Sequence, residues 1–334
     1  MSELRRDPIL RRWVIMAPER AAELVPRRGE PPAPRRDTAG PCPFCPGSEA
    51  LNPAEIAVVR DGQAWAVRVT PDKEPLLRIE GELGRRAAGM FDLMNAIGAH
   101  ELVTDVPAHT VAWADFPVPQ MIRLLEVYRD RTRDLRRDPR FRFVLVLKNH
   151  GAIWSRYGHS HSHVVATPFT PKRIEEEIAG AREYHRMRER CVFCDQITEE
   201  LRAEARVVAR NADFVTFAPF ASEHPYETWV VPLEHAADFG TLSDNALGSL
   251  AEFLVDALAR LHRATGLDLA RDANFVMSFR NVGGMGGRAI RSVRRVTHVC
   301  RECGEHSVIA KTTPWPDRWT CPWCGRENPL GGPR

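Results

Sequence analysis

The chain has 334 residues, of which 43% are hydrophobic and 27% charged. No apolar run approaches the roughly 18 to 20 residues of a membrane-spanning helix, and the segment Met1–Trp13 lacks the apolar core of a secretory signal. The 47 basic and 44 acidic residues nearly balance, which does not indicate a nucleic-acid binder. At about 100 to 200 residues per domain, the length predicts two domains, and we expect a cytoplasmic protein without a membrane partner.

All eight cysteines fall into Cys-x-x-Cys pairs, and these are Cys42/Cys45, Cys191/Cys194, Cys300/Cys303 and Cys321/Cys324. Two thiolates at this spacing can bind one tetrahedral ion, so zinc is the leading interpretation and a redox dithiol is the alternative. A disulfide framework is not expected in a cytosolic chain of this size. The last two pairs are separated by 17 residues, which predicts a zinc ribbon over residues 298–334.

The same order of signals occurs twice along the chain. Each copy has a cysteine pair, a short strand, a Glu-to-His segment, an amphipathic helix and a β-rich stretch. The first copy uses residues 42–45, 65–70, 101–109, 118–134 and 143–151, and the second uses 191–194, 214–218, 227–235, 243–265 and 275–283. The repetition predicts a duplication and an α+β fold with mostly antiparallel pairing.

The domain organisation follows from this repeat. We expect two tandem domains over residues 1–170 and 171–297, joined by a helix near 170–190, followed by the small zinc ribbon at 298–334. The proline- and arginine-rich segment 26–40 has the composition of a surface loop or extended arm.

Three histidines alternate with serines in the segment His159–Val165. Alternate residues of a strand face the same way, so the three imidazoles are expected on one face and the serines on the other. Such a strand could bind a metal ion or hold a nucleophilic histidine. The first cysteine pair needs two further ligands, and His109 and His159 can complete it. His161 and His163 then remain for catalysis.

Further short motifs accompany this strand in a characteristic order: Arg6-Asp7-Pro8, Arg12-Trp13-Val14, Cys42-Pro-Phe-Cys45-Pro-Gly47, Pro107-Ala-His109, Lys148-Asn149-His-Gly151 and His159–Pro168. Together they resemble the galactose-1-phosphate uridylyltransferases, in the branch that includes the plant-type ADP-glucose phosphorylase, within the histidine-triad superfamily. The resemblance covers roughly residues 5 to 282. It implies two packed histidine-triad-like halves, with catalysis in the first half, structural zinc and a homodimer.

The resemblance also implies roles for individual residues. His161 matches the nucleophile that attacks the α-phosphate of a nucleotide sugar and releases hexose 1-phosphate, after which a second sugar phosphate takes the nucleotidyl group. The matching zinc ligands are Cys42, Cys45, His109 and His159. Asn149 and Gly151 match a phosphate-positioning turn, Ser155 lies in the loop before the nucleophile, and Asp72 and Lys73 follow a strand end where the family contacts the nucleotide. An ordinary turn or solvated loop is the alternative for these five residues.

Two departures from the family pattern concern the histidines. The transferases usually carry glutamine where this chain has His163, and a third histidine is typical of histidine-triad hydrolases. An ADP-sugar phosphorylase or a nucleotide hydrolase is therefore an alternative to the transferase. In the second copy, residues 291–297 contain no histidine, so that half offers no second nucleophile.

The remaining cysteine pairs leave further alternatives. Cys191, Cys194 and His235 provide three ligands for a second zinc ion, and His298 or His224 could supply the fourth. The ribbon's tryptophans and arginines could bind nucleic acid or protein, but we expect them to pack around the metal-stapled module instead. A zinc-ribbon binding module on an old enzyme scaffold is thus the hypothesis of another class.

Overall fold

The computed structural model describes residues 2–8, 12–17, 41–109, 111, 113–150, 157–222 and 226–265, together with the backbone of five later strands. The chain divides into two compact units, Met1–Met285 and Gly286–Arg334. Within the described residues, no helix is long and apolar enough to span a bilayer.

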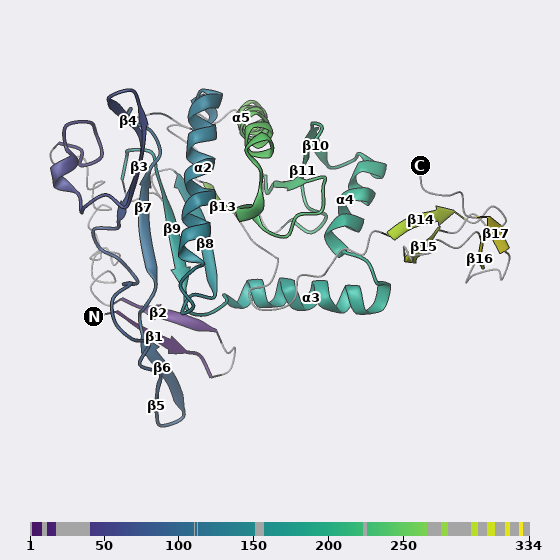
Figure 1. Cartoon of the computed structure of the whole chain (residues 1–334), viewed down its shortest axis with the longest axis horizontal. Helices are drawn as coiled ribbons and strands as arrows, with labels where there is room; N and C mark the ends of the chain where they lie inside the picture. Colours follow the sequence, from purple (N-terminus) through teal and green to yellow (C-terminus); the bar gives the residue numbers. More distant parts are fainter. Residues whose placement is uncertain are drawn as a thin grey trace. The chain divides into compact units, whose positions relative to one another are not determined.

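A six-stranded antiparallel sheet forms the centre of the first unit, in the order β13-β8-β9-β7-β4-β3 (Figure 1). Its strands are β3 (Ala57–Asp61), β4 (Ala64–Pro71), β7 (Ala99–Thr104), β8 (Phe143–His150), β9 (His161–Thr167) and β13 (Phe275–Phe279). These segments are rich in valine and other residues that favour a half-buried pleated surface. β13 comes from the second copy of the repeat, and it pairs along β8, with Met277 opposite Lys148.

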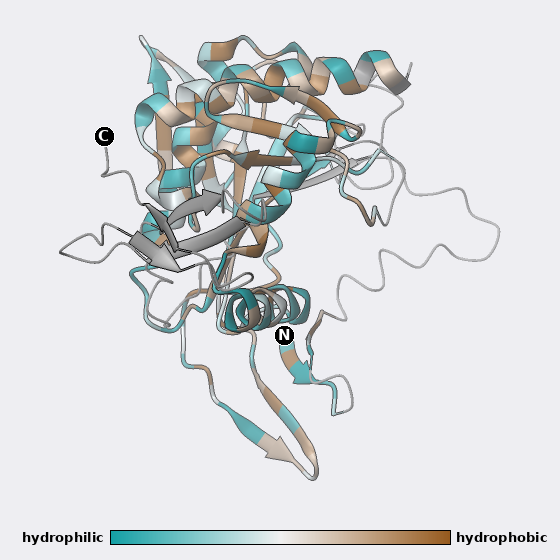
Figure 2. Cartoon of the chain, turned by 90° about the vertical axis from the view of Figure 1, so that its right-hand side faces the viewer, coloured by the Kyte–Doolittle hydropathy of each residue, from teal (hydrophilic) through white to brown (hydrophobic). Residues whose placement is uncertain are grey.

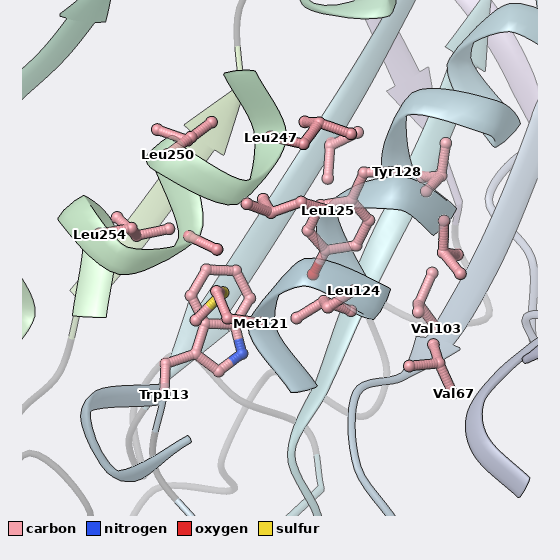
Figure 3. Close-up of a cluster of buried hydrophobic side chains, with 14 of the residues drawn as sticks. Val67, Val103, Trp113, Met121, Leu124, Leu125, Tyr128, Leu247, Leu250 and Leu254 are labelled. Atoms are coloured by element: carbon pink, nitrogen blue, oxygen red, sulfur yellow. The ribbon is translucent and has the colours of Figure 1, made fainter. Parts of the chain in front are cut away.

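Helix α2 (Val118–Leu135) covers one face of this sheet (Figure 3). Its residues Met121, Leu124, Leu125 and Tyr128 are completely buried. Fully burying a leucine side chain contributes about 2 kcal/mol, so this apolar face fixes the helix on the sheet. Pro117 precedes the helix and occupies a position where no intrahelical N–H bond is lost.

Helix α5 (Asp244–Thr265) packs beside α2 and extends the same core. Leu247, Leu250 and Leu254 supply its buried face. The contact is also polar, because Arg129 on α2 donates to the Asp244 carboxylate at 2.6 Å and to the Leu242 carbonyl at 3.1 Å. The two copies of the repeat therefore share one hydrophobic core.

A second sheet has the order β2-β1-β6-β5 and is formed by β1 (Glu3–Arg6), β2 (Trp13–Met16), β5 (Arg86–Ala88) and β6 (Phe91–Asn95). Leu4, Leu77 and Met94 form its small apolar cluster. The β5–β6 hairpin extends from this sheet at the bottom of Figure 2, and Met90 at its turn is 75% exposed.

The remaining elements form one further sheet, two helices, three short 3-10 helices and two hairpins among the described residues. A three-stranded sheet contains β10 (Val207–Arg210), β11 (Phe214–Phe217) and β12 (Trp229–Pro232). Helices α3 (Lys172–Arg188) and α4 (Val192–Ala203) precede it, and Figure 2 shows α3 end-on as largely hydrophilic. Three short 3-10 helices are η1 (Glu49–Leu51), η2 (Trp113–Asp115) and η3 (Phe239–Thr241). Two hairpins form from β14 (Arg295–Val299) with β15 (His306–Ala310), and from β16 (Arg318–Thr320) with β17 (Glu327–Pro329).

The predicted α+β class with antiparallel sheets is confirmed. The helices expected at 118–134, 243–265 and 170–190 are α2, α5 and α3. The strand expected from His159 begins two residues later, at His161, because the imidazole of His159 turns toward the first cysteine pair. Helix α4, which begins directly after Cys191, was not predicted.

Candidate active site

The two faces of β9 separate the serines from the histidines. Ser162 Oγ lies 2.5 Å from the hydroxyl of Tyr128 on α2, so the serines face the helix. His163 pairs with Leu102 on β7, and His161 pairs with Thr104. Because side chains alternate along a strand, His161 and His163 lie on the face turned away from α2. Of the three imidazoles for which this alternation was predicted, those of His161 and His163 show it, whereas His159 lies before the strand.

Four side chains that could bind a metal ion meet beside the start of β9. Cys45 Sγ lies 3.3 Å from His109 Nδ1 and 3.7 Å from His159 Nδ1, and Cys42 Sγ lies 3.6 Å from His159 Nδ1. All four ligand atoms lie within 4.8 Å of one another, close enough to bind one metal ion. The distances suit a tetrahedral site with two sulfur and two nitrogen ligands.

The protonation states in this cluster also suit a cation. His159 Nε2 donates to the Val106 carbonyl at 2.7 Å, which leaves the lone pair of Nδ1 facing the sulfur atoms. Burial lowers the pKa of His159, and neutral imidazole is the ligand form. Burial raises the pKa of the Cys42 thiol to about 11, so a thiolate there needs a positive partner.

A second, more exposed group contains Cys191, Cys194 and His235. Cys194 Sγ lies 3.1 Å from His235 Nδ1. A hydrogen bond from Cys194 lowers the pKa of Cys191 to about 5, so one thiol of this pair ionises readily. The three predicted ligands of the second site are therefore brought together. Among the residues that the structure describes, no fourth ligand joins them, and the candidate His224 lies outside those residues.

His161 is 1% exposed, and its two ring nitrogens differ. Nδ1 lies 2.8 Å from the carbonyl oxygen of His159, and only a ring N–H can donate to that oxygen. The lone pair is therefore on Nε2, which is buried and has no hydrogen-bond partner within the described part of the chain. Burial, followed by the charges of His163 and Lys148, lowers the pKa of His161 to about 3. A neutral imidazole with an uncommitted Nε2 is the form that a nucleophile requires.

An ion pair lies behind His161, on the α2 side of the sheet. Lys148 Nζ lies 2.7 Å from Asp105 Oδ2 and donates to the His161 carbonyl at 2.8 Å. Burial alone would raise the pKa of Asp105, but the Lys148 ammonium lowers it below its usual value. Asp105 also accepts hydrogen bonds from Ser160, Ser162 and Trp113. The pair thereby connects β7, β8 and β9 beneath His161.

A further group of side chains adjoins His163 on the catalytic face. His100 Nε2 lies 3.2 Å from His163 Nδ1, and Asp72 Oδ2 lies 3.5 Å from the same atom of His100. Asp72 is 2% exposed, and the side chain of His163 is 13% exposed. The ring centroids of His161 and His163 are 5.2 Å apart, so this group borders His161.

The other predicted site residues differ in how they are placed. Asn149 lies on β8 two residues after Leu147, which pairs with His163, so it shares the catalytic face. Asp72 adjoins His163, whereas Lys73 is exposed beside it. Outside the described residues lie Gly151, Ser155, Cys300, Cys303, Cys321 and Cys324.

Sequence reasoning missed His100 and the pairing of Asp105 with Lys148. Each residue adjoins or lies within a quoted segment, since His100 precedes Glu101, Asp105 lies between Glu101 and His109, and Lys148 begins Lys148–Gly151. A charged residue inside an otherwise apolar strand was the available signal, because such a residue is rarely buried without a partner.

Comparisons with known proteins agree with the resemblance that the sequence motifs indicate. No family model matches the chain. The chain is 28% identical over 265 residues to the ADP-glucose phosphorylase of Arabidopsis thaliana, covering 77% of this chain and 74% of that protein. It is 28% identical over 239 residues to the galactose-1-phosphate uridylyltransferase of Thermotoga maritima, covering 71% of this chain and 68% of that protein.

Solved structures share the fold. A uridylyltransferase structure matches with a TM-score of 0.65 and 24% identity, over 83% of this chain and 79% of that one. The Arabidopsis thaliana ADP-glucose phosphorylase with bound ADP-glucose matches with a TM-score of 0.61 and 25% identity, over 86% of this chain and 92% of that one. The chain is thus similar in sequence to proteins of these two names, and it shares their fold. The predicted resemblance to galactose-1-phosphate uridylyltransferases and ADP-glucose phosphorylase is confirmed.

Proposed function

We propose that this protein is a nucleotidyltransferase that moves a nucleoside monophosphate between a nucleotide sugar and a hexose 1-phosphate. The observation that carries the proposal is the buried, uncommitted Nε2 of His161 beside His163. The relatives named galactose-1-phosphate uridylyltransferase and ADP-glucose phosphorylase support the same class of reaction.

The reaction has two displacement steps at one phosphorus atom. His161 Nε2 attacks the α-phosphorus of the nucleotide sugar, the bond to the bridging oxygen breaks, and hexose 1-phosphate leaves with that oxygen. A phosphate oxygen of the second hexose 1-phosphate then attacks the nucleotidyl-histidine, and the phosphorus–nitrogen bond breaks to restore His161. Lys148, through the His161 carbonyl, holds the nucleophile's backbone during both steps.

The catalytic face supplies the proposed substrate contacts. We assign Asn149, Gly151 and Ser155 to the phosphates, and Asp72 and Lys73 to the end of β4 where the nucleotide binds. His163 is assigned to the phosphoryl group next to the nucleophile. ADP-sugar phosphorolysis, with inorganic phosphate as the acceptor, is the second candidate function, favoured by the similarity to ADP-glucose phosphorylase.

Zinc is the metal that we propose for the Cys42/Cys45/His109/His159 cluster, where it supplies structural support below the catalytic strand. The same metal is proposed for Cys191/Cys194/His235 and for a four-cysteine ribbon. We also propose two tandem histidine-triad-like domains before that ribbon, a homodimer, and a cytoplasmic protein without membrane or nucleic-acid partners.

Covalent labelling tests the proposed reaction. Incubation with UDP-glucose or ADP-glucose radiolabelled at the α-phosphate is expected to leave label on the polypeptide, and adding a hexose 1-phosphate is expected to remove it as a new nucleotide sugar. Release by inorganic phosphate as a nucleoside diphosphate would identify the phosphorylase. A protein that forms no labelled intermediate with any nucleotide sugar would contradict the proposal.

Metal analysis tests the zinc sites. We expect about two to three zinc ions per chain, with one lost in Cys45→Ser because a serine hydroxyl is a poor zinc ligand. The matched variant Cys194→Ser is expected to lose a different ion and to keep the covalent labelling, since no residue of its cluster belongs to β9. One zinc ion or none in the unmodified protein would show that the cysteine pairs serve another purpose.

A further inference from the structure

The imidazole of His163 belongs to a chain of hydrogen bonds that starts at a backbone amide. The N–H of Leu76 lies 3.1 Å from Nδ1 of His100, and Nε2 of His100 lies 3.2 Å from Nδ1 of His163. Leu76 follows β4, His100 lies on β7 and His163 lies on β9. The strands β4, β7 and β9 are neighbours in the central sheet (Figure 1). The chain of bonds therefore crosses the sheet beside the nucleophile.

The backbone amide fixes the direction of these bonds. A backbone N–H can only donate, so Nδ1 of His100 accepts and carries no proton. The single N–H of neutral His100 is therefore at Nε2, which faces His163. Nδ1 of His163 then accepts, and the proton of a neutral His163 lies on its Nε2.

The nearby carboxylate does not reverse this order. Asp72 Oδ1 accepts the N–H of Glu74 at 2.8 Å, whereas Oδ2 lies 3.5 Å from His100 Nε2 and 3.6 Å from His163 Nδ1. Both of these distances exceed the 3.2 Å between the imidazoles, and they are at or beyond hydrogen-bonding range. Among the residues that the structure describes, Asp72, His100 and His161 are the charged or titratable groups seen next to His163. A second proton on His163 Nδ1 would place two N–H donors against each other.

The same three side chains, Asp72, His100 and His163, also lie at distances that suit a divalent metal ion. A metal bound to His100 Nε2 would require the ring proton to be on Nδ1. That proton would point at the N–H of Leu76, which is itself a donor. The direction of the backbone bond therefore favours a hydrogen-bond chain over a metal site.

We propose that His100 is a positioning residue that holds His163 neutral, with its Nε2–H as a hydrogen-bond donor. His163 then does what the glutamine of the related transferases would do, since it donates to a phosphoryl oxygen and accepts no proton. The proposal rests on the proposed function, because it assigns the donor to the nucleotidyl group on His161.

This arrangement has a consequence for the second displacement step. A phosphate oxyanion attacks the phosphorus of nucleotidyl-His161 without losing a proton, and the phosphorus–nitrogen bond breaks. Water must give a proton to a base as it attacks, and a His163 fixed as an Nε2–H donor offers no lone pair for it. The nucleotidyl-enzyme is therefore expected to react with phosphate or a phosphate ester and to resist hydrolysis.

Nuclear magnetic resonance tests the hydrogen-bond chain without any substrate. In the full-length, nitrogen-labelled protein near neutral pH, long-range proton–nitrogen spectra are expected to show His100 and His163 both protonated at Nε2 and unprotonated at Nδ1. In His100→Phe, the proton of His163 is expected to move to Nδ1, toward Asp72. A His163 protonated at Nδ1 in the unmodified protein, or a pattern unchanged in His100→Phe, would overturn the proposal.

The fate of the labelled intermediate gives the second measurement. Without the His100 donor, the ring proton of His163 moves to Nδ1, next to Asp72, and Nε2 becomes a base. The ratio of the hydrolysis rate to the transfer rate is therefore expected to rise about 10-fold or more in His100→Phe. In the double variant His100→Phe/His163→Gln, the glutamine amide supplies an N–H donor but no basic nitrogen. The ratio of hydrolysis to transfer in this variant is expected to return to a low value. A ratio that stays high in the double variant would overturn the assignment to His163. If no intermediate forms in the unmodified protein, the proposed function is wrong. The spectra would still show whether the hydrogen bonds from Leu76 through His100 to His163 have the proposed direction.

Discussion

Replacing His161 by glycine is expected to abolish covalent labelling and to lower the rate of nucleotide exchange by at least about 10³-fold. The substitution removes the only ring nitrogen that is buried and without a hydrogen-bond partner among the described histidines. Binding contacts from the rest of the site would remain, so any residual exchange reflects positioning without a nucleophile. The labelling assay with a nucleotide sugar carrying α-phosphate label measures this result directly.

The matched control is His185→Gly, at the C-terminal end of the hydrophilic helix α3. It makes the same chemical change away from β9, and it is expected to retain the label. Zinc content provides a second control, because His161 is not among the four clustered ligands and its variant should keep the same metal count. Label that survives in His161→Gly, at an unchanged metal content, would assign the nucleophile to another residue.

Much of the fold could be predicted because its signals are local. Helix α2 has Pro117 before it and a stripe that includes Met121 and Leu125, so spacing alone predicts its face. The first cysteine–histidine cluster could also be predicted, since the Cys-x-x-Cys pair suggests two further side chains nearby and the repeat points to His109. Helix α4 was not predicted, because the spacing of Cys191 and Cys194 is typical of a metal-binding turn, whereas here the first cysteine occupies the N-cap position of the helix and the second lies in its first turn.

The electrostatics of the site could not be predicted in the same way. His100 and His163 are 63 positions apart, and they meet only because β7 and β9 pair in one particular register. A shift of one residue would place His163 on the face toward α2. The same holds for Asp105 and Lys148, whose contact depends on three strands and on the burial of both side chains.

The choice of lysine at position 148 has a physical explanation that becomes visible only in the fold. The chain contains few lysines among its 47 basic residues. An ammonium group is a compact charge with three donors, whereas a guanidinium is a broad planar fork. Lys148 Nζ uses this geometry to reach Asp105, Ser160 and the His161 carbonyl at 2.7, 2.9 and 2.8 Å.

Lys148→Met is therefore expected to destabilise the protein by about 3 to 5 kcal/mol, since it leaves the buried Asp105 carboxylate without its cation. Covalent labelling is also expected to slow, because the His161 carbonyl loses a donor. Urea unfolding of the zinc-loaded protein measures the first effect. The double variant Lys148→Met/Asp105→Asn removes the unpaired charge. Its amide oxygen can still accept from the Trp113 N–H, and the Ser162 hydroxyl can accept from the amide NH2, so we expect it to be more stable than Lys148→Met alone.

The pH dependence of this cycle separates a lost charge partner from a simple packing defect. In the unmodified protein Lys148 lowers the pKa of Asp105, so the pair stabilises the fold above the unfolded value near 3.8 and loses this contribution as pH falls through the folded value. In Lys148→Met, burial without a cation raises the pKa of Asp105, so a proton neutralises it at mildly acidic pH. The stability difference between the two proteins should narrow from pH 7 toward pH 5, whereas Lys148→Met/Asp105→Asn should show no such narrowing. A constant difference in both variants would mean that the Lys148 stem, rather than its charge, supports the strand beneath His161.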